Sequence, residues 1–288
     1  MKPARFDYAR PQTLTKALDL LARHGADASI LAGGQSLMPM LNLRMSQPAI
    51  LIDINAIAGM DTIQRNGDRI VIGGLARHND VLRSVVLADA GSLLPRAMAF
   101  VAHAAIRNRG TLGGSLALAD PAAEMPACAV CLDAEIVAIS ARGERAIPAA
   151  PFFQGLYSTV LEPDEIVHRV SYPVLDESWH VEFDEVARRR GDFALAGLAL
   201  AVRLDNDCIA DCRMVFAGVE AFPRRITPAE TALIGGGLRD LHARAAAVEA
   251  LERSLLPLEG GEYPPAYRRH LARGLLTRLL DRIGQRRA

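Results

Sequence analysis

The chain has 288 residues, of which 50% are apolar, and its formal net charge is zero. The absence of excess positive charge argues against nucleic-acid binding, and the length allows two domains with a sizeable core. No apolar run reaches the roughly 20 residues that span a bilayer, and the first residues lack the apolar segment of a secretory signal. We therefore expect a cytoplasmic protein without a membrane span that does not bind nucleic acid.

The first part of the chain alternates between helix and strand signals. The expected elements are a helix over 13–25, a strand over 29–32, a helix over 37–43 and a buried strand over 50–54. Thr13 suits the N-cap of the first helix, and Gly25 suits its end. Such alternation predicts a small α/β unit.

Residues 61–175 predict a second unit. Its expected elements are a strand over 69–72, helices over 80–86 and 92–105, an irregular run over 106–115, a helix from Glu124, and strands over 135–140 and 165–172. A strand, two glycines, a polar turn and a helix follow one another near residues 33, 73 and 113. We interpret this echo as recurrent turn chemistry and not as a repeat protein.

The pattern changes after Pro173, where a polar cluster precedes Trp179. The expected elements are strands over 183–186, 195–204 and 208–219, a hairpin connection at 205–207, and helices that begin at 227 and cover 238–255 and 265–283. Thr227 and Glu230 have the spacing of a capping box, with a proline at the first helical position. Strands followed by helices predict a small α+β domain.

Gly33, Gly34, Gln35 and Ser36 stand between an expected strand and an expected helix. Two glycines let the backbone turn tightly and let a phosphate approach, and the free N–H groups of the following turn attract an anion. A plain strand-to-helix turn explains the same residues equally well. Neither GxGxxG nor GxxxxGK(S/T) occurs, so an ordinary Rossmann or P-loop site is not expected.

The segment from Thr111 to Ser115, with the letters TLGGS, has the same character. Arg107 and Arg109 precede it, and arginine binds phosphate in a bidentate way, although an arginine on a loop more often faces solvent. Two such loops from separate units could hold one long dinucleotide between them. The pair is therefore a more specific signal than either loop alone.

The four cysteines form two close pairs, Cys128 with Cys131 and Cys208 with Cys212. One interpretation is a four-thiolate zinc or iron–sulfur site. The first pair lies in an alanine-rich helical stretch, and the second lies in a strand-like stretch where positions four apart share a face. Neither has a glycine-rich knuckle, so we favour small buried residues in a reducing compartment and expect no metal site in this chain.

His78 and His103 are the candidates for acid–base groups. His78 lies in a polar turn and His103 ends a helical stretch, positions that favour a structural or cofactor-adjacent role. Neither a serine–histidine–aspartate arrangement nor an HExxH motif is recognisable. We therefore expect no catalytic residue in this chain.

Three longer stretches carry a resemblance to a known family: LAGGQSLMPMLNLR, IRNRGTLGGSLALADPAAEMPA and ARRRGDFALAG. In this order and spacing they resemble the FAD subunits of the xanthine dehydrogenase and carbon monoxide dehydrogenase family of molybdenum hydroxylases, over essentially the whole chain. The resemblance implies an α+β fold. A PCMH-type FAD-binding domain would cover 1–175, with subdomains of about 1–58 and 59–175, and a domain of three antiparallel strands and a helical bundle would cover 176–288.

The resemblance also implies which residues surround the flavin. The FAD pyrophosphate would be wrapped by the backbone N–H groups of a continuous loop, namely Ala32, Gly33, Gly34, Gln35, Ser36 and Leu37. The phosphate and ribitol side would be held by Thr111, Gly114 and Ser115. Asp120 and Glu124 would bind the polar part of the adenosine or of the ribitol.

Further residues are implied around the two ring systems. Val101 and Ala102 would lie near the adenine, and Ile166 would pack on the isoalloxazine. The strand and turn over 183–190 would border this ring from the second domain. Some relatives place a lysine early in this strand, where the matching residue here is Asp184. The residue that stabilises negative charge on the reduced flavin is therefore left open.

By this resemblance, the chain carries FAD and transfers electrons. A small [2Fe-2S] subunit would deliver them from a large subunit with a molybdenum–pterin cofactor, in a dimer of heterotrimers, and FAD would pass them to an external acceptor. FAD would be bound noncovalently, because no His or Cys lies in the two flavin-binding motifs. Two alternatives remain: a self-sufficient flavin oxidoreductase with a base beside the flavin, and a nucleotide-sensing module without a redox role.

Overall fold

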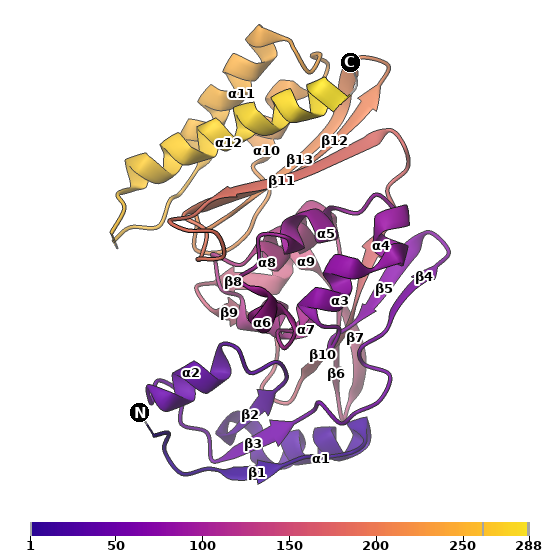
Figure 1. Ribbon diagram of the computed structural model, residues 1–288, viewed down its shortest axis with the longest axis vertical. Helices are drawn as coiled ribbons and strands as arrows, with labels where there is room; N and C mark the ends of the chain where they lie inside the picture. Colours follow the sequence, from indigo (N-terminus) through magenta and orange to yellow (C-terminus); the bar gives the residue numbers. More distant parts are fainter. Residues whose placement is uncertain (1, 261, 287–288) are drawn as a thin grey trace.

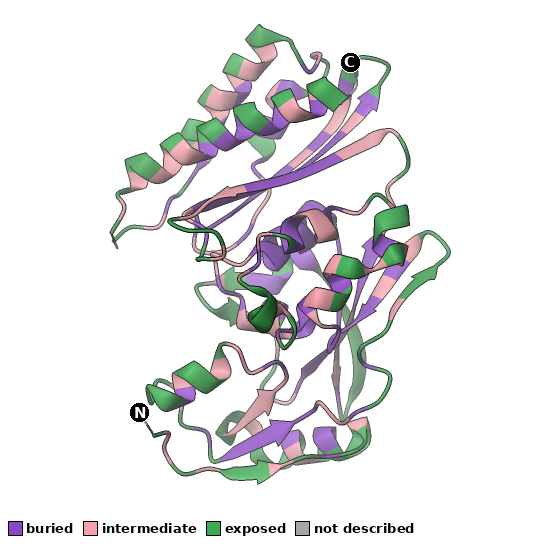
Figure 2. Cartoon of the chain, viewed as in Figure 1, coloured by how far each residue is buried: buried purple, intermediate pink, exposed green. Residues whose placement is uncertain are grey.

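The computed structural model describes residues 2–260 and 262–286. Figure 1 shows three units stacked along the longest axis, in chain order from the indigo N-terminal unit to the unit that ends in the yellow helix. Each unit has its own main sheet, and buried residues concentrate on the sheets and on the helices packed against them (Figure 2). Within the described residues, we find no helix that is long and apolar enough to cross a membrane.

The first unit is a three-stranded parallel sheet in the order β1-β3-β2. Its elements are β1 (Asp7–Ala9), α1 (Leu14–His24), a 3-10 turn (Gly25–Asp27), β2 (Ala28–Leu31), α2 (Leu37–Asn42) and β3 (Ile50–Asp53). As predicted, the side chain of Thr13 caps α1 by accepting a hydrogen bond from the Lys16 N–H at 3.3 Å. The sequence does not predict β1, because this short and largely exposed segment becomes a strand only by pairing with β3.

The second unit is a five-stranded antiparallel sheet in the order β4-β5-β10-β6-β7. Its strands are β4 (Ile63–Asn66), β5 (Arg69–Gly73), β6 (Glu135–Ser140), β7 (Gly143–Pro148) and β10 (Ile166–Pro173), beside a small sheet of β8 (Phe153–Gly155) and β9 (Ser158–Thr159). Its helices are α3 (His78–Arg83), α4 (Val85–Asp89), α5 (Leu93–Met98), α6 (Ala104–Arg107), α7 (Leu112–Leu118), α8 (Glu124–Cys131) and α9 (Ala149–Phe152). Ile72, Val170 and Ile136 lie side by side across the sheet and share a core with α5, α7 and α8.

Two helices that the sequence predicts as continuous are divided. The helix expected over 80–86 breaks at Ser84, whose side chain accepts a hydrogen bond from the Leu87 N–H at 3.3 Å and so begins α4. The helix expected over 92–105 is interrupted between α5 and α6. Ala102 there has a φ of 41°, in the left-handed region that an α-helix cannot include.

The run expected to be irregular over 106–115 is helical at both ends, because α6 extends into it and α7 begins at Leu112. Thr111 occupies the N-cap of α7, and its side chain accepts a hydrogen bond from the Gly114 N–H at 3.1 Å. The second glycine motif is therefore the first turn of a helix and not a loop.

The third unit is a three-stranded antiparallel sheet in the order β11-β12-β13 with helices on one face (Figure 1). Its elements are β11 (Trp179–Val186), β12 (Ala196–Asp205), β13 (Cys208–Ala217), α10 (Thr227–Leu233), α11 (Leu241–Ser254) and α12 (Pro265–Arg286). Along β12, Leu198, Leu200 and Val202 pack in a core with these helices. Ala199 and Ala201 point the other way and share a core with the second unit, so small side chains let the units approach closely.

The predicted capping box of α10 is wrong. Ile226 is the N-cap residue, and Thr227 is already the first residue of the helix, so its side chain does not cap. The carboxylate of Glu230 is buried and accepts hydrogen bonds from Arg225 Nε and from the Met214 N–H, each at 2.8 Å. Glu230 thus ties α10 to β13 instead of closing the helix end.

Two of the four cysteines lie in α8 and two lie in β13. Cys128 and Cys131 are buried in α8, Cys212 is buried in β13, and Cys208 is exposed. The prediction that Cys208 and Cys212 share a face is wrong, because the register between β12 and β13 shifts near Leu204. In the part of the chain that the structure describes, no three or more His, Cys, Asp or Glu side chains are grouped so that they could hold a metal ion.

Candidate cofactor site

The two glycine motifs, distant in sequence, meet where the first and second units join. A Cβ added to Gly33 would lie 2.4 Å from the carbonyl oxygen of Arg109 and 2.8 Å from the Cα of Gly110. No side chain fits in this space, so the close approach of the two backbones requires glycine at position 33. Gly34 has a φ of 71°, which lets the chain turn into α2.

The first loop presents backbone donors without acceptors. From Gly33 to Leu37, no backbone N–H donates to an acceptor in the described residues, and the first intrahelical bond runs from the Met38 N–H to the Gly34 carbonyl at 3.1 Å. Ser36 stands at the N-cap as expected, but its side chain makes no capping bond. A succession of free N–H groups in a tight turn is a site for an anion such as a phosphate.

The N–H groups of the second motif are largely used within the protein. The Leu112 N–H donates to the Ala76 carbonyl at 3.0 Å, and the Gly113 N–H donates to the Gly74 carbonyl at 2.9 Å. A Cβ on Gly113 would lie 2.6 Å from the Gly74 carbonyl oxygen, so this glycine permits close packing of α7 on the end of β5. Gly114 and Ser115, by contrast, are partly exposed, and they are the members of this motif that a ligand can reach.

His78 holds the second motif in place. Its backbone N–H donates to the Gly110 carbonyl at 2.9 Å, and its ring Nε2 lies 3.0 Å from the Thr111 carbonyl oxygen. Burial lowers the pKa of His78 to about 4, so the ring is neutral at pH 7 and Nε2 carries the proton donated to Thr111. His78 is therefore a structural residue beside the site.

Val101 and Ala102, predicted to lie near the adenine, form the bend between α5 and α6. Arg107 Nη1 donates to both of their carbonyl groups, at 2.8 Å each, and so holds the left-handed turn at Ala102. The connection between β11 and β12 reaches the same bend. A Cβ on Gly191 would lie 2.7 Å from the ring of His103 and 3.0 Å from the Ala102 carbonyl oxygen.

The predicted acidic residues are buried near the start of α8. Burial raises the pKa of Asp120, while hydrogen bonds from the Ala122 N–H and the Tyr157 hydroxyl oppose this rise. Burial raises the pKa of Glu124 to about 8, and the negative charge of Glu185 adds to the effect. Glu124 is therefore mostly protonated at pH 7 and can donate a hydrogen bond.

Glu185, on β11, lies within the expected border strand and turn over 183–190, although the resemblance singles out only its neighbour Asp184. Burial raises its pKa to about 7, and the charge of Asp184 adds to the effect. Its Oε2 is buried and has no hydrogen-bond partner among the described residues. Strand alternation could have indicated the direction of its side chain, because Phe183 and Glu185 share a face of β11. This face points to the second unit, where the ring centroids of Phe183 and Phe100 are 5.5 Å apart.

A hollow lies beside Glu185 and Phe100, between the second and third units. Its volume is about 260 Å³, and it is lined by Ala99, Phe100, Glu185, Ala187, Arg189 and Arg190. The expected border strand and turn over 183–190 thus contribute most of its wall. Arg188 is turned away and pairs with Glu262 at 2.9 Å.

Asp184 is not brought together with the other predicted residues. Its carboxylate accepts hydrogen bonds from Arg278 at 3.1 Å and from Arg282 at 2.9 Å, both on α12. It therefore lies on the face of β11 opposite to Phe183 and Glu185. The alternation of a strand explains this placement, because adjacent residues point to opposite faces.

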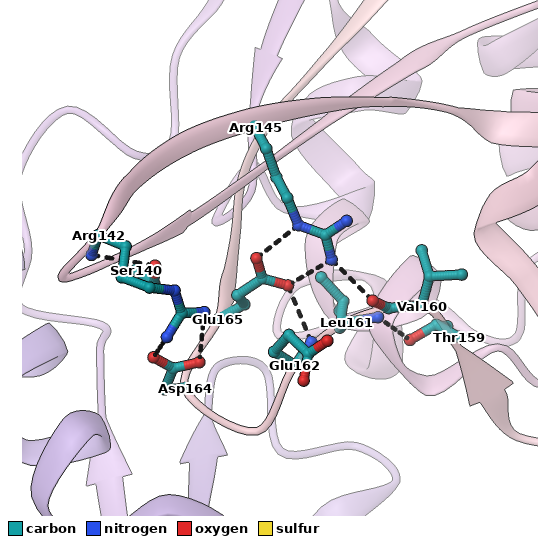
Figure 3. Close-up of polar contacts among 9 residues, drawn as sticks. All are labelled: Ser140, Arg142, Arg145, Thr159, Val160, Leu161, Glu162, Asp164 and Glu165. Carbon is teal, nitrogen blue, oxygen red and sulfur yellow. Dashed lines mark hydrogen bonds and ion pairs between the residues drawn. The ribbon is translucent and has the colours of Figure 1, made fainter.

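Ile166 begins β10 and is buried in the core of the first unit's sheet. The residue before it, Glu165, accepts two hydrogen bonds from Arg145, at 2.6 and 2.7 Å, and one from the Glu162 N–H at 2.8 Å. Figure 3 shows Glu165 at the centre of these contacts, with the separate pair of Arg142 and Asp164 beside it. The network fixes the loop that leads into Ile166.

The chain is similar to known proteins over most of its length. Residues 4–175 match the family described as the FAD binding domain in molybdopterin dehydrogenase. The chain belongs to the flavoprotein subunits of the molybdenum hydroxylases. Residues 181–283 of this flavoprotein subunit match the family described as the CO dehydrogenase flavoprotein C-terminal domain.

Individual relatives resemble the flavoprotein subunit over most of its length. It is 40% identical over 282 residues to the 6-hydroxypseudooxynicotine dehydrogenase complex subunit alpha of Paenarthrobacter nicotinovorans. This match covers 97% of this chain and 95% of the relative. It is 42% identical over 236 residues to caffeine dehydrogenase subunit beta of a Pseudomonas species, with 82% and 80% covered. Carbon monoxide dehydrogenase from Hydrogenophaga pseudoflava superposes with a TM-score of 0.92 at 34% identity, with 96% of each chain covered.

These findings confirm the family resemblance and the α+β fold, and they show that the flavoprotein subunit is an oxidoreductase component with an FAD-binding domain. The residues present fit FAD. The free N–H groups of Gly33–Leu37 can donate hydrogen bonds to the negatively charged oxygens of a pyrophosphate. The backbone contact at Gly33 sets this loop against the second glycine motif.

Proposed function

We propose that FAD lies across the two glycine motifs, with its pyrophosphate on the free N–H groups of residues 32–37. In this placement Thr111, Gly114 and Ser115 border the phosphate and ribitol, and Ile166 borders the isoalloxazine. Val101 and Ala102 lie near the adenine, with Asp120 and Glu124 on the polar part of the molecule. The succession of unpaired N–H groups in the first loop is the observation that carries this proposal.

The chain's own residues would bind and orient the cofactor and would not perform acid–base chemistry. Bound FAD supplies the capacity to accept electrons one at a time and to pass them on. His78 is neutral and hydrogen-bonded to the Thr111 carbonyl, so it holds the loop and takes no proton at pH 7. Neither a His nor a Cys lies in the two motifs, and we propose that FAD is bound noncovalently.

We further propose that the chain works as the middle carrier of a multi-subunit molybdenum hydroxylase, in a dimer of heterotrimers. A [2Fe-2S] subunit would reduce its FAD, a molybdenum–pterin subunit would oxidise the substrate, and an external acceptor would take the electrons. Relatives named as subunits of dehydrogenase complexes support this reading. The four free cysteines suit a reducing compartment, and we place the complex in the cytoplasm.

We propose that the chain divides near residue 175 into the FAD-binding domain and a domain that closes the site from the other side. The first would cover 1–175, with subdomains of about 1–58 and 59–175, and the second 176–288. The matches to two separate families and the separate core of α10, α11 and α12 with β12 and β13 support this division.

Co-purification tests the proposed function. The chain is tagged in its native host, and the purified material is analysed for FAD, iron and molybdenum and for its polypeptides. We expect flavin that is released by acid, together with two further polypeptides, one carrying iron and one carrying molybdenum. A flavin-free chain would contradict the FAD placement, and a flavin-loaded chain without metal-containing partners that oxidises small organic substrates would favour the self-sufficient oxidoreductase.

A further inference from the structure

Two side chains outside both glycine motifs hold these motifs together. Asn55 follows β3, and its Nδ2 donates to the carbonyl of Ala32 at 2.8 Å and, more weakly, to that of Leu31 at 3.3 Å. Arg77 precedes α3, and its Nη1 donates to the carbonyl of Arg109 at 2.5 Å. Arg77 Nη2 also donates to Asn55 Oδ1 at 2.6 Å. We call this pair the cross-brace.

The cross-brace is anchored in the first unit. The carboxylate of Asp53 accepts hydrogen bonds from the Asn55 side chain at 2.6 Å and from the Asn55 N–H at 2.9 Å. The hydroxyl of Tyr8, on β1, donates to the same carboxylate at 2.5 Å. A continuous path of hydrogen bonds therefore runs from the first sheet, through Asn55 and Arg77, to the second motif.

The contact with Ala32 has a consequence for the first loop. In a planar trans peptide the C=O and the following N–H point in opposite directions. When Asn55 takes the Ala32 carbonyl, the Gly33 N–H must point away from the cross-brace. The Gly33 N–H is one of the groups of this loop that have no acceptor within the described chain.

The contact with Arg109 sets the distance between the motifs. The Arg109 carbonyl oxygen is the atom nearest to a Cβ built on Gly33, at 2.4 Å, so it lies within the space that a side chain would need. Arg77 binds this carbonyl while it also binds Asn55, so one guanidinium spans the junction between two units whose sheets are separate. A ligand that contacts both motifs needs them held to within about 0.5 Å.

We propose that Asn55 and Arg77 are positioning residues for FAD, which act by fixing the first glycine loop against the second. The inference rests on the proposed placement of FAD across both motifs. Neither side chain needs to touch the cofactor. Loss of either bond frees the Ala32 or the Arg109 carbonyl, and the N–H groups of the first loop then lose their fixed direction.

A purely structural role would lower the stability of the protein without a separate loss of FAD affinity. Arg69 offers a matched control, because it is also half-buried and also binds one side chain and one carbonyl. Its Nε donates to Ser171 Oγ at 2.5 Å and its Nη2 to the Ser171 carbonyl at 3.0 Å. These bonds join β5 to β10 and do not involve either glycine motif.

The test measures the FAD dissociation constant of the full-length apoprotein by quenching of flavin fluorescence, and its unfolding free energy in urea without FAD. The variants are Asn55→Ala, Arg77→Lys, the double variant and Arg69→Lys. We expect each cross-brace variant to raise the dissociation constant by about tenfold or more, beyond any change that Arg69→Lys causes. The double variant should be no more than about threefold worse than the poorer single one, because the two residues act as one unit.

The proposal is overturned if Asn55→Ala and Arg77→Lys bind FAD within about twofold of Arg69→Lys at equal loss of stability, or if their effects multiply in the double variant. If Asn55→Ala does not fold, Arg77→Lys, which keeps the charge and the stem, decides alone. Failure of the proposed FAD placement looks different. In that case wild-type apoprotein does not bind FAD, or binds it equally well after Gly33→Ala.

Discussion

At the residue scale, the site depends on backbone groups more than on side chains. Gly33 admits no Cβ beside Arg109 and Gly110, and the residues after it leave their N–H groups free. The sequence predicts this loop correctly as a glycine turn, and the family resemblance predicts that its ligand is the FAD pyrophosphate. The contact between the two motifs is not predictable from the sequence, because it depends on how two separate sheets are packed.

A single methyl group at position 33 should separate the motifs. Gly33→Ala places its Cβ against backbone atoms that cannot move alone, so we expect FAD affinity to fall by about a hundredfold. The measurement is flavin content after purification and titration of the apoprotein. Gly274→Ala is the control, because a Cβ added there in α12 would meet no atom within 4 Å apart from its own helix backbone, and it should leave flavin binding unchanged. Equal flavin content in both variants would refute the argument.

His78 should make the protein sensitive to acid. Its folded pKa of about 4 lies below the ordinary value of about 6.5, so between these values the unfolded chain binds a proton that the folded chain does not. The unfolding free energy should therefore fall as the pH falls through this window, by about 2 kcal/mol between pH 7.5 and pH 5 from this residue. Urea unfolding of wild type and His78→Asn measures it. The variant should lose less stability over this range, and an equal loss would disprove the assignment.

At the scale of elements, long periodic segments are predicted well and short or interrupted ones are not. The strands at β3, β5 and β10 and the helix α1 follow their apolar patterns. β7 is mostly exposed and becomes a strand only through its pairing with β6, so its sequence carries little signal. The bend at Ala102 is also hidden in the sequence, because Arg107 imposes it from the next helix.

The loop before β10 should depend on Glu165 and not on its neighbour. Glu165→Ala removes a buried carboxylate that binds Arg145 and the Glu162 N–H, and we expect the unfolding free energy to fall by about 2–3 kcal/mol. Asp164→Asn breaks the exposed pair with Arg142 and should leave stability nearly unchanged. Urea unfolding of both variants distinguishes them, and similar losses would contradict the role assigned to Glu165.

At the scale of the whole molecule, the order of motifs along the chain predicts the family and the α+β architecture, and both are confirmed. The arrangement of the third unit is less accessible. Asp184 was expected beside the flavin but faces α12, whereas Glu185 lines the hollow between the units. A one-residue difference in a strand decides which face a carboxylate occupies, and the sequence pattern alone does not fix that phase.

We propose that this chain receives electrons on FAD from an iron–sulfur partner. This transfer is tested most directly by mixing, without oxygen, the flavin-loaded chain with the chemically reduced iron–sulfur subunit that co-purifies with it, while flavin absorption is followed. We expect the oxidised flavin band to disappear with the partner present and to persist without it. A flavin that the reduced partner leaves oxidised, but that a small organic substrate reduces on the isolated chain, would contradict the account.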